Sequence, residues 1–227
     1  MKRLKDYFER RYYQLLRLVV GRKRRDEMLR KKEMKYNSDL VKRYGPEAIR
    51  VFSEIIAAEN SSYWLFFGSL LGAYREHAFI ELDEDIDVGM YYSEMTVSLI
   101  DKMEENGFKC LHIIVDKDLK EGMHFAFDYK GVKFDIYSFQ ENIDNKSYTV
   151  FFPLPYNYRK PGSVLRTDIW EEVHGLVPIW ERLKQITFEG ISTFIPSNAD
   201  AILKLLYGDD YMTPTPGRKA DDETASQ

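Results

Sequence analysis

The chain has 227 residues, of which 44% are hydrophobic and 15% aromatic, so it can bury a core and is not a disordered chain. Its single cysteine, Cys110, excludes an internal disulfide framework and a zinc site built from several thiolates. The net charge of −4 divides into +8 over residues 1–33, with thirteen basic and five acidic side chains, and −12 over the rest, and this acidic body argues against nucleic acid as a partner.

The N-terminal segment is predicted to form a basic amphipathic helix over residues 1–42. Between Phe8 and Val20 apolar residues recur at steps of three and four, with arginine and lysine on either side. Two interpretations follow from this pattern. Either residues 1–33 lie on an anionic membrane surface, or the helix is solvated and docks on the body of the protein or on a partner subunit.

No secretory signal or membrane-spanning segment is apparent in the sequence. The longest early apolar stretch, Leu15–Val20, is interrupted by Arg17 and is far too short to cross a bilayer. We therefore expect a cytoplasmic protein, which is peripheral on the inner face of the membrane if the basic helix binds lipid.

Beyond residue 44 the pattern changes to short strands and helices. Gly45-Pro46 predicts a break, and Pro46 suits the first turn of a new helix that ends near Asn60. The pairs Lys130-Gly131 and Glu189-Gly190 predict hairpin turns, and Gly208 the end of the last helix. The predicted elements are strands at 63–67, 85–91, 108–115, 123–129, 132–139 and 147–152, a hairpin over 186–195, and helices at 69–74, 94–105 and 198–207.

These elements predict an α+β fold in which helices flank a mixed β-sheet. We divide the chain into a basic helical extension over residues 1–44, a main domain over 45–212 and a flexible tail over 213–227. An aromatic, proline-rich loop at 153–162 is long enough to act as a lid for an acceptor.

The stretch from Phe66 to Met90, FFGSLLGAYREHAFIELDEDIDVGM, carries the first part of the chemistry. Because side chains alternate along a strand, Asp85 and Asp87 face the same side, while Ile86 and Val88 face the core. Two neighbouring carboxylates repel each other, and a hard divalent cation removes that repulsion. The pattern therefore predicts a metal site on this strand.

A third acid, Asp135, lies in the apolar strand Val132–Ile136, where a bare carboxylate is costly. We predict that Asp85, Asp87 and Asp135 are the catalytic residues and hold Mg²⁺, or Mn²⁺ in its place, in a two-metal site. The alternatives for Asp135 are a turn cap and an ion pair with Lys133.

Gly68 and Ser69 stand where a strand passes into a helix, which is a place suited to a phosphate. Glycine lets a phosphate approach the backbone, the free N–H groups of the helix favour anions, and the Ser69 hydroxyl can add a hydrogen bond. Arg75 follows one helical stretch later and can hold a phosphate oxygen or brace the acids. We predict that these three residues bind the phosphorylated donor.

The order of Gly-Ser, Asp-x-Asp and a later Asp is the pattern of the nucleotidyltransferase superfamily, and the string from Phe66 to Met90 resembles the LicD family. Phe134–Tyr137 resembles the strand of the third carboxylate, and residues 195–212, ending in LKLLYGDDYM, resemble the closing motif. The resemblance covers residues 47–217 and leaves out the basic helix. It departs from the family at Glu84, where an aspartate is common, on the side of the strand away from the metal.

The resemblance implies a nucleotidyltransferase-like catalytic domain over 45–212. It implies a CDP-activated alcohol phosphate as donor and a sugar hydroxyl of a cell-surface glycan, or of its lipid-linked precursor, as acceptor, with CMP leaving and Asp135 serving as general base. Lys204 and Tyr211 lie near the closing motif and are expected to contact the donor. The alternatives are a lysine that faces solvent and a tyrosine packed in the core.

Two rival functions remain open at this point. A nucleotidyltransferase acting on a small molecule would use the same three acids, and its nucleotide would stay on the acceptor. A metal-free scaffold, tethering a glycan-assembly complex through the basic helix, would have no use for three converging acids. Of the histidines, His112 and His124 are predicted to be core or edge residues, and His174 to bind a sugar or to fill the core.

Overall fold

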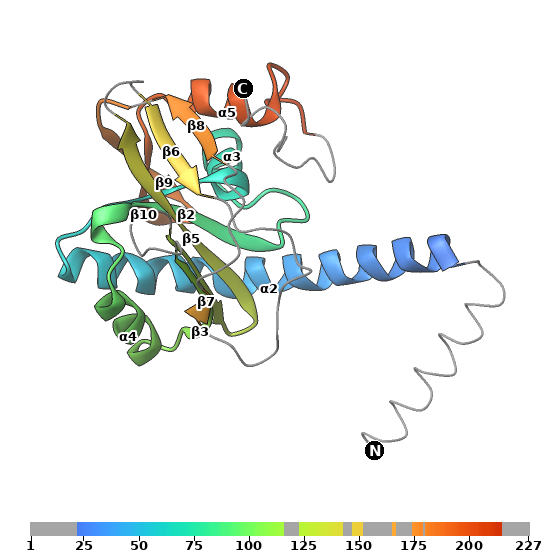
Figure 1. The fold of residues 1–227 in the computed structure, drawn as a ribbon. Coiled ribbons are helices and arrows are strands. Elements are labelled where there is room, and N and C mark those ends of the chain that lie inside the picture. The colour runs from blue at the N-terminus through green and yellow to red at the C-terminus, as the bar shows by residue number, and fades with distance from the viewer. Residues whose placement is uncertain are drawn as a thin grey trace. The chain divides into compact units, whose positions relative to one another are not determined.

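The computed structural model describes residues 22–115, 123–142, 147–151, 165–166, 174–178 and 180–214 (Figure 1). The chain divides into two compact units, Met1–Tyr36 and Asn37–Gln227. Of the first unit, residues 22–36 are helical and carry exposed basic side chains, whereas the predicted apolar stripe of residues 8–20 lies outside the described residues. None of the described helices is both long and apolar enough to span a membrane.

The helix α2 (Arg22–Ala58) runs through the predicted break, so that prediction is wrong. Pro46 has no N–H to bond the preceding turn, but tight packing in this part of the helix offsets the loss. An added Cβ at Gly45 would lie 2.8 Å from the ring of Phe79, so this glycine allows close packing rather than ending the helix. The fully buried residues on either side are Val41, Ala48, Ile49 and Phe52.

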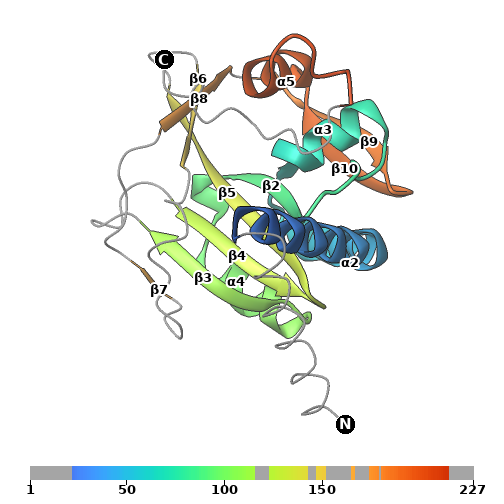
Figure 2. The same cartoon turned by 90° about the vertical axis from the view of Figure 1, so that its right-hand side faces the viewer.

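Eight strands form one mixed sheet in the order β1-β2-β5-β4-β3-β7, and β6 pairs with both β5 and β8. β2 and β5 are parallel neighbours at its centre, and β4 and β5 form an antiparallel hairpin. Figure 2 shows β5, β4 and β3 side by side. The strands are β1 (Tyr63–Leu65), β2 (Asp85–Tyr91), β3 (Lys109–Val115), β4 (Met123–Tyr129), β5 (Val132–Asn142), β6 (Ser147–Phe151), β7 (Leu165–Arg166) and β8 (His174–Pro178).

The remaining elements follow the predicted order closely. A separate hairpin is formed by β9 (Leu183–Phe188) and β10 (Ile191–Pro196). The helices are α3 (Phe67–Arg75), the 3-10 turn η1 (Tyr92–Glu94), α4 (Val97–Glu105) and α5 (Ala199–Tyr207). α5 lies beside β8 and near α3 (Figure 1). The expectation of an α+β fold with helices flanking a mixed sheet is confirmed.

The turn of the β4–β5 hairpin fixes which residues face each other. Lys130 and Gly131 both have positive φ, 55° and 90°, as the two central positions of a type I′ turn require. The resulting register places Ala126 opposite Asp135. On the other side of β5, Asp135 pairs with Asp87 of β2.

The two faces of the central sheet differ sharply in character. Ile86 and Val88 are fully buried, as predicted, and belong to the core on one face. On β5 the ring of Phe134 packs 4.8 Å from Phe52 of α2, which marks the same face as the one covered by that helix. The acids of β2 and β5 therefore lie on the opposite face, because neighbouring residues alternate across a strand.

Candidate metal and active site

Three carboxylates come together on β2 and β5. Asp85, Asp87 and Asp135 each offer an oxygen within 4.8 Å of the others. The parallel pairing of the two strands brings this about, since Asp87 stands directly opposite Asp135 and Asp85 precedes Asp87 by two residues on the same face. Oxygens this close together can be ligands of the same divalent cation, or of two neighbouring ones.

The electrostatics of this acid triad (Asp85, Asp87 and Asp135) are uneven. Burial raises the pKa of Asp87 well above its usual value, and the negative charges of Asp85 and Asp135 raise it further. Burial acts in the same direction on Asp135, but the Lys133 ammonium and His124 outweigh it and hold the pKa of Asp135 below its usual range. The Lys133 ammonium and His124 thus stabilise the ionised form of Asp135, whereas Asp87 bears the cost of the repulsion.

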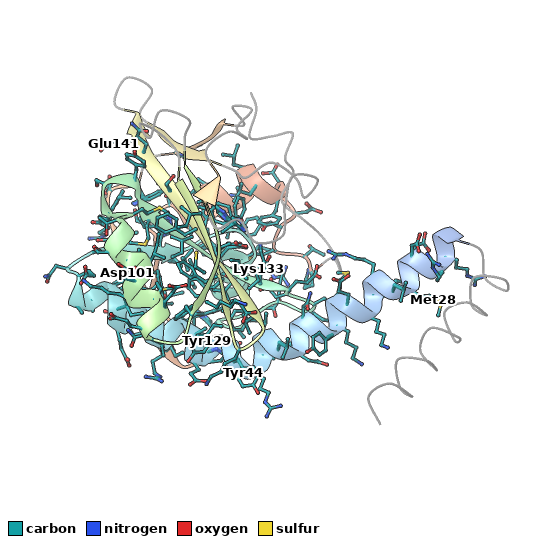
Figure 3. The ribbon with its side chains drawn as sticks, turned by 60° about the horizontal axis from the view of Figure 1, so that its bottom comes forward. Met28, Tyr44, Asp101, Tyr129, Lys133 and Glu141 are labelled. Carbon is teal, nitrogen blue, oxygen red and sulfur yellow. The ribbon has the colours of Figure 1, made fainter. Side chains whose placement is uncertain are left out.

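Lys133 enters the site from β5, two residues before Asp135 (Figure 3). Its ammonium forms an ion pair with the Oδ2 of Asp135, and its Nζ lies 3.7 Å from the Oδ2 of Asp85. The alternative that Asp135 pairs with Lys133 is therefore confirmed. The pairing occurs inside the acid triad, so it does not remove Asp135 from the predicted site.

Two further side chains surround the acids on the same face. The Nε2 of His124 lies 3.2 Å from the Oδ1 of Asp135, and its Nδ1 lies 3.3 Å from the Nε2 of His112. Both histidines are buried, as expected, but His124 is also a neighbour of a candidate ligand. Tyr137 shares a hydrogen bond with Asp87. These contacts orient the carboxylates of Asp87 and Asp135.

Gly68 and Ser69 lie in the first turn of α3, next to the acids. The Ser69 hydroxyl is fully buried and accepts a hydrogen bond of 3.0 Å from the backbone N–H of Asp87. A Cβ on Gly68 would lie 3.0 Å from the Oδ1 of Asp83, a buried acid whose pKa is raised by burial and by Asp85. Ser69 thus braces β2, and the first turn of α3 already faces a carboxylate.

The backbone is strained at both segments that lead into the site. Phe67 and Leu82 have φ values of 40° and 66°, a region that bulky residues rarely adopt. Phe67 immediately precedes Gly68, and Leu82 immediately precedes Asp83. Strain of this kind persists where surrounding packing imposes it and is concentrated at functional sites.

The other predicted donor-binding residues form a second group, between α3 and α5. Arg75 pairs with Glu76 and donates to the backbone oxygen of Tyr211 at 3.5 Å. Tyr211 is buried and donates its hydroxyl to Asp200 at 2.6 Å, and Lys204 pairs with the same Asp200 at 2.8 Å. No contact between this group and the acid triad is recorded among the described residues, and its predicted donor contacts remain predictions.

One residue of the closing motif does approach the acids. Tyr207, on α5, is buried, and burial together with the charges of Asp87 and Asp83 raises its pKa. α5 therefore borders the acid triad through Tyr207 rather than through Lys204. The loop at 153–162 lies outside the described residues, as does the side chain of His174.

The donor set of the acid triad fits a hard divalent cation. All three ligands are carboxylates, the type that Mg²⁺ and Mn²⁺ prefer, and two of them are buried. One ammonium does not balance three carboxylates. The remaining negative charge lies in a buried setting, where a further cation stabilises it most.

The sequence held signals for three neighbours of Asp135 that the prediction did not assign to the site. Lys133 and Tyr137 stand two residues on either side of Asp135, so alternation alone puts them on its face. The two-residue turn at Lys130-Gly131 fixes the hairpin register and places His124 opposite Tyr137. The register of the β4–β5 pairing therefore identifies the residues that lie next to Asp135.

Comparison with known families finds one match, which covers more than half of the chain. Residues 60–198 match the model of a domain family described as LicD/FKTN/FKRP, nucleotidyltransferase domain. The matched range includes the acid triad, Gly68, Ser69 and Arg75, and it ends before Lys204 and Tyr211. No curated protein matches the chain.

Proposed function

This chain belongs to the LicD/FKTN/FKRP nucleotidyltransferase-domain family, and we propose that it is a metal-dependent transferase with a CDP-activated donor. Family membership makes it a transferase in general terms, of the kind that modifies glycans with phospho-alcohols. The proposed reaction moves a phospho-alcohol, such as phosphocholine or a polyol phosphate, to a sugar hydroxyl of a cell-surface glycan or its precursor, and releases CMP. The observation that carries the proposal is the convergence of Asp85, Asp87 and Asp135.

We propose that these three acids hold the divalent cation, Mg²⁺ or Mn²⁺. When bound, such an ion neutralises the charge on the donor's phosphates and positions the reacting groups. Ser69 contributes by holding the backbone of Asp87 in place. Tyr137 and His124 orient the carboxylates of Asp87 and Asp135 in the same way.

The assignment of a general base differs from the sequence-based expectation. A general base works best when its pKa lies near the working pH. The pKa of Asp135 is lowered in the metal-free protein, which makes it a weak base, whereas that of Asp87 is raised. We therefore propose that the acceptor's proton passes to an acid of the triad, with Asp87 as a candidate beside Asp135, since a bound cation lowers the pKa of both.

The donor phosphates are proposed to approach the first turn of α3. The glycine at position 68 has no side chain to block an approach to the backbone, and the N–H groups of the turn favour anions. Asp83 faces the same position, so the phosphates would enter between Asp83 and the acid triad. Arg75, Lys204 and Tyr211 are proposed to line the more distant part of the donor site.

Calorimetry tests the proposal directly. Binding of CDP and of a panel of CDP-alcohols is measured with and without Mg²⁺ on the wild type, on Asp87→Ala and on Asp101→Ala, an exposed acid of α4 that serves as control. We expect Mg²⁺-dependent binding that is lost only in Asp87→Ala. Failure of every cytidine nucleotide to bind would reject the donor, and nucleotide retained on an acceptor would favour a small-molecule nucleotidyltransferase.

The basic N-terminal segment is proposed to place the enzyme on an anionic membrane surface, on the inner face of the membrane. Among the described residues of the first unit, Arg24, Arg30, Lys31, Lys32 and Lys35 are exposed. Each basic residue near such a surface contributes about 1 kcal/mol. Co-sedimentation with anionic vesicles, compared with neutral ones, is the test, and equal recovery with both would reject lipid contact.

A further inference from the structure

Lys133 lies against the acid triad, and the proposed reaction gives it no role. Its side chain comes from β5, at the centre of the sheet, and reaches the carboxylates of Asp135 and Asp85. It is a partner of the least exposed acid of the triad, since Asp135 has no solvent-accessible surface. The Lys133 ammonium therefore occupies the place beside these carboxylates in which a metal ion would bind.

The position of Lys133 is fixed by the sheet rather than by chance contact. In the β2–β5 register Lys133 stands directly opposite Asp85, and alternation along β5 puts it on the face of Asp135. Its ammonium therefore lies between two acids on two strands. The third acid, Asp87, lies one step further along and shares a hydrogen bond with Tyr137 instead.

A second lysine in the same hairpin shows what an ordinary pairing looks like. Lys130, in the turn, pairs with Glu47 at 2.6 Å, and the two side chains are 47% and 39% exposed. Such a surface pair contributes little and holds no buried charge in place. Lys133 differs because one partner is fully buried and the other belongs to the same candidate metal site.

We propose that the Lys133 ammonium is an internal cation that competes with the divalent ion for Asp85 and Asp135. In the metal-free protein it offsets one of the three negative charges and bridges Asp85 and Asp135. When an ion binds, the ammonium is displaced from Asp135 and is free to turn toward a phosphate of the donor. Lys133 is thus a positioning residue that weakens metal binding when no donor is present.

This inference rests on the proposed metal site, and it is tested with Mn²⁺ alone. The dissociation constant for Mn²⁺ is measured by calorimetry, and independently from the Mn²⁺ electron-spin resonance signal, on the wild type, Lys133→Met, Lys133→Arg and Lys130→Met. Removing a positive charge that pairs directly with Asp135 and lies 3.7 Å from the Oδ2 of Asp85 is expected to tighten Mn²⁺ binding about tenfold or more. Lys133→Arg keeps the charge and Lys130→Met changes only the exposed pair, so both are expected to resemble the wild type.

The outcomes separate the two proposals. If the wild type binds Mn²⁺ and Lys133→Met binds it equally or more weakly, competition by Lys133 is overturned while the metal site stands. If neither protein binds Mn²⁺, both the competition and the metal site are overturned. Tighter binding in Lys133→Met but also in Lys130→Met would show a general charge effect and would equally overturn the specific role.

The substitution also removes a charge that compensates buried acids, so thermal unfolding is measured alongside. If Lys133→Met is destabilised or unfolded without metal, competition predicts that Mn²⁺ takes over the compensating role. Its melting temperature should then rise by more than that of the wild type on adding saturating Mn²⁺. A variant that stays unfolded, or gains no more than the wild type, overturns the inference.

Discussion

The acid triad and the group between α3 and α5 both contain charged residues predicted to bind the donor, yet they are built in opposite ways. In the α3–α5 group each charge has a protein partner of opposite sign, with Arg75 on Glu76 and Lys204 on Asp200. In the acid triad three carboxylates share a single ammonium. Of the two groups, only the triad therefore carries an excess of negative charge in a buried setting.

This difference separates residues that need a ligand from residues that do not. A buried excess of negative charge costs stability and therefore points to something missing. A satisfied network holds elements together without any ligand. If this is correct, substitutions in the triad should change the response of the protein to metal, and substitutions in the α3–α5 group should not.

The largest effect is expected for Asp87→Asn. Replacing neighbours of a metal ligand typically costs 10- to 100-fold in affinity or activity, so loss of a ligand should cost at least about a hundredfold. The substitution also removes a repelled carboxylate, so the metal-free protein should become more stable while it loses the rise in melting temperature caused by Mn²⁺. Transfer assays and thermal unfolding with and without Mn²⁺ measure both changes.

The matched control for this substitution is Asp101→Asn, on the exposed side of α4. It should leave activity, stability and the response to Mn²⁺ unchanged. An Asp87→Asn protein that keeps its response to Mn²⁺ would place the cation elsewhere and break the contrast between the two groups.

The next effect is expected for Ser69→Ala, which leaves the buried N–H of Asp87 without its acceptor. The loss of such a partner costs about 1 to 3 kcal/mol of unfolding free energy. Because the freed strand carries a ligand, Mn²⁺ affinity should fall as well. Chemical denaturation and calorimetry give the two numbers, with the exposed Ser98→Ala as control. Loss of donor affinity with stability and Mn²⁺ affinity intact would instead mean that Ser69 touches the phosphate.

A smaller effect is expected for Tyr211→Phe, which removes the hydroxyl bonded to Asp200 and keeps the buried ring. The expected loss is about 1 kcal/mol, the usual net value of one hydrogen bond. Unlike the loss in Ser69→Ala, it should be the same with and without Mn²⁺. Denaturation in both conditions checks this, and a loss that depends on metal would join Tyr211 to the triad.

The smallest effect is expected for Lys204→Met. Its pair with Asp200 is exposed on both sides, so the melting temperature should not change measurably. The equally exposed pair of Arg50 and Glu54 supplies the control, Arg50→Met. A fall in CDP affinity at unchanged stability, seen only for Lys204→Met, would confirm the predicted donor contact.

Much of the sheet and the core of the candidate site follow from alternation and turn chemistry. Period-two patterning predicts β2 to the residue and places Asp85 and Asp87 on one face. Lys130-Gly131 predicts the hairpin that carries Asp135. These features are local, and local rules are enough to find them.

What escaped prediction depends on contacts distant in sequence. Pro46 and Gly45 look like a helix break, but packing against Phe79 keeps α2 continuous. The hydrogen bond that Ser69 accepts from the N–H of Asp87 also escaped prediction, because it forms only when β2 lies beside α3. The division of the chain into an extension and a main domain at residue 44 stays a prediction. It depends on the function of the N-terminal segment, which the sequence pattern of that segment does not determine.

The two-residue turn at Lys130-Gly131 has a consequence for how this enzyme can vary. β5 presents core residues to one side and site residues to the other, and its partner β4 does the same with Phe125 and His124. A shift of one residue in the pairing of β4 with β5 would send a phenylalanine toward the acids and a histidine into the apolar core. The turn prevents this shift, and both of its central residues have positive φ, so its length and its residue types are constrained together.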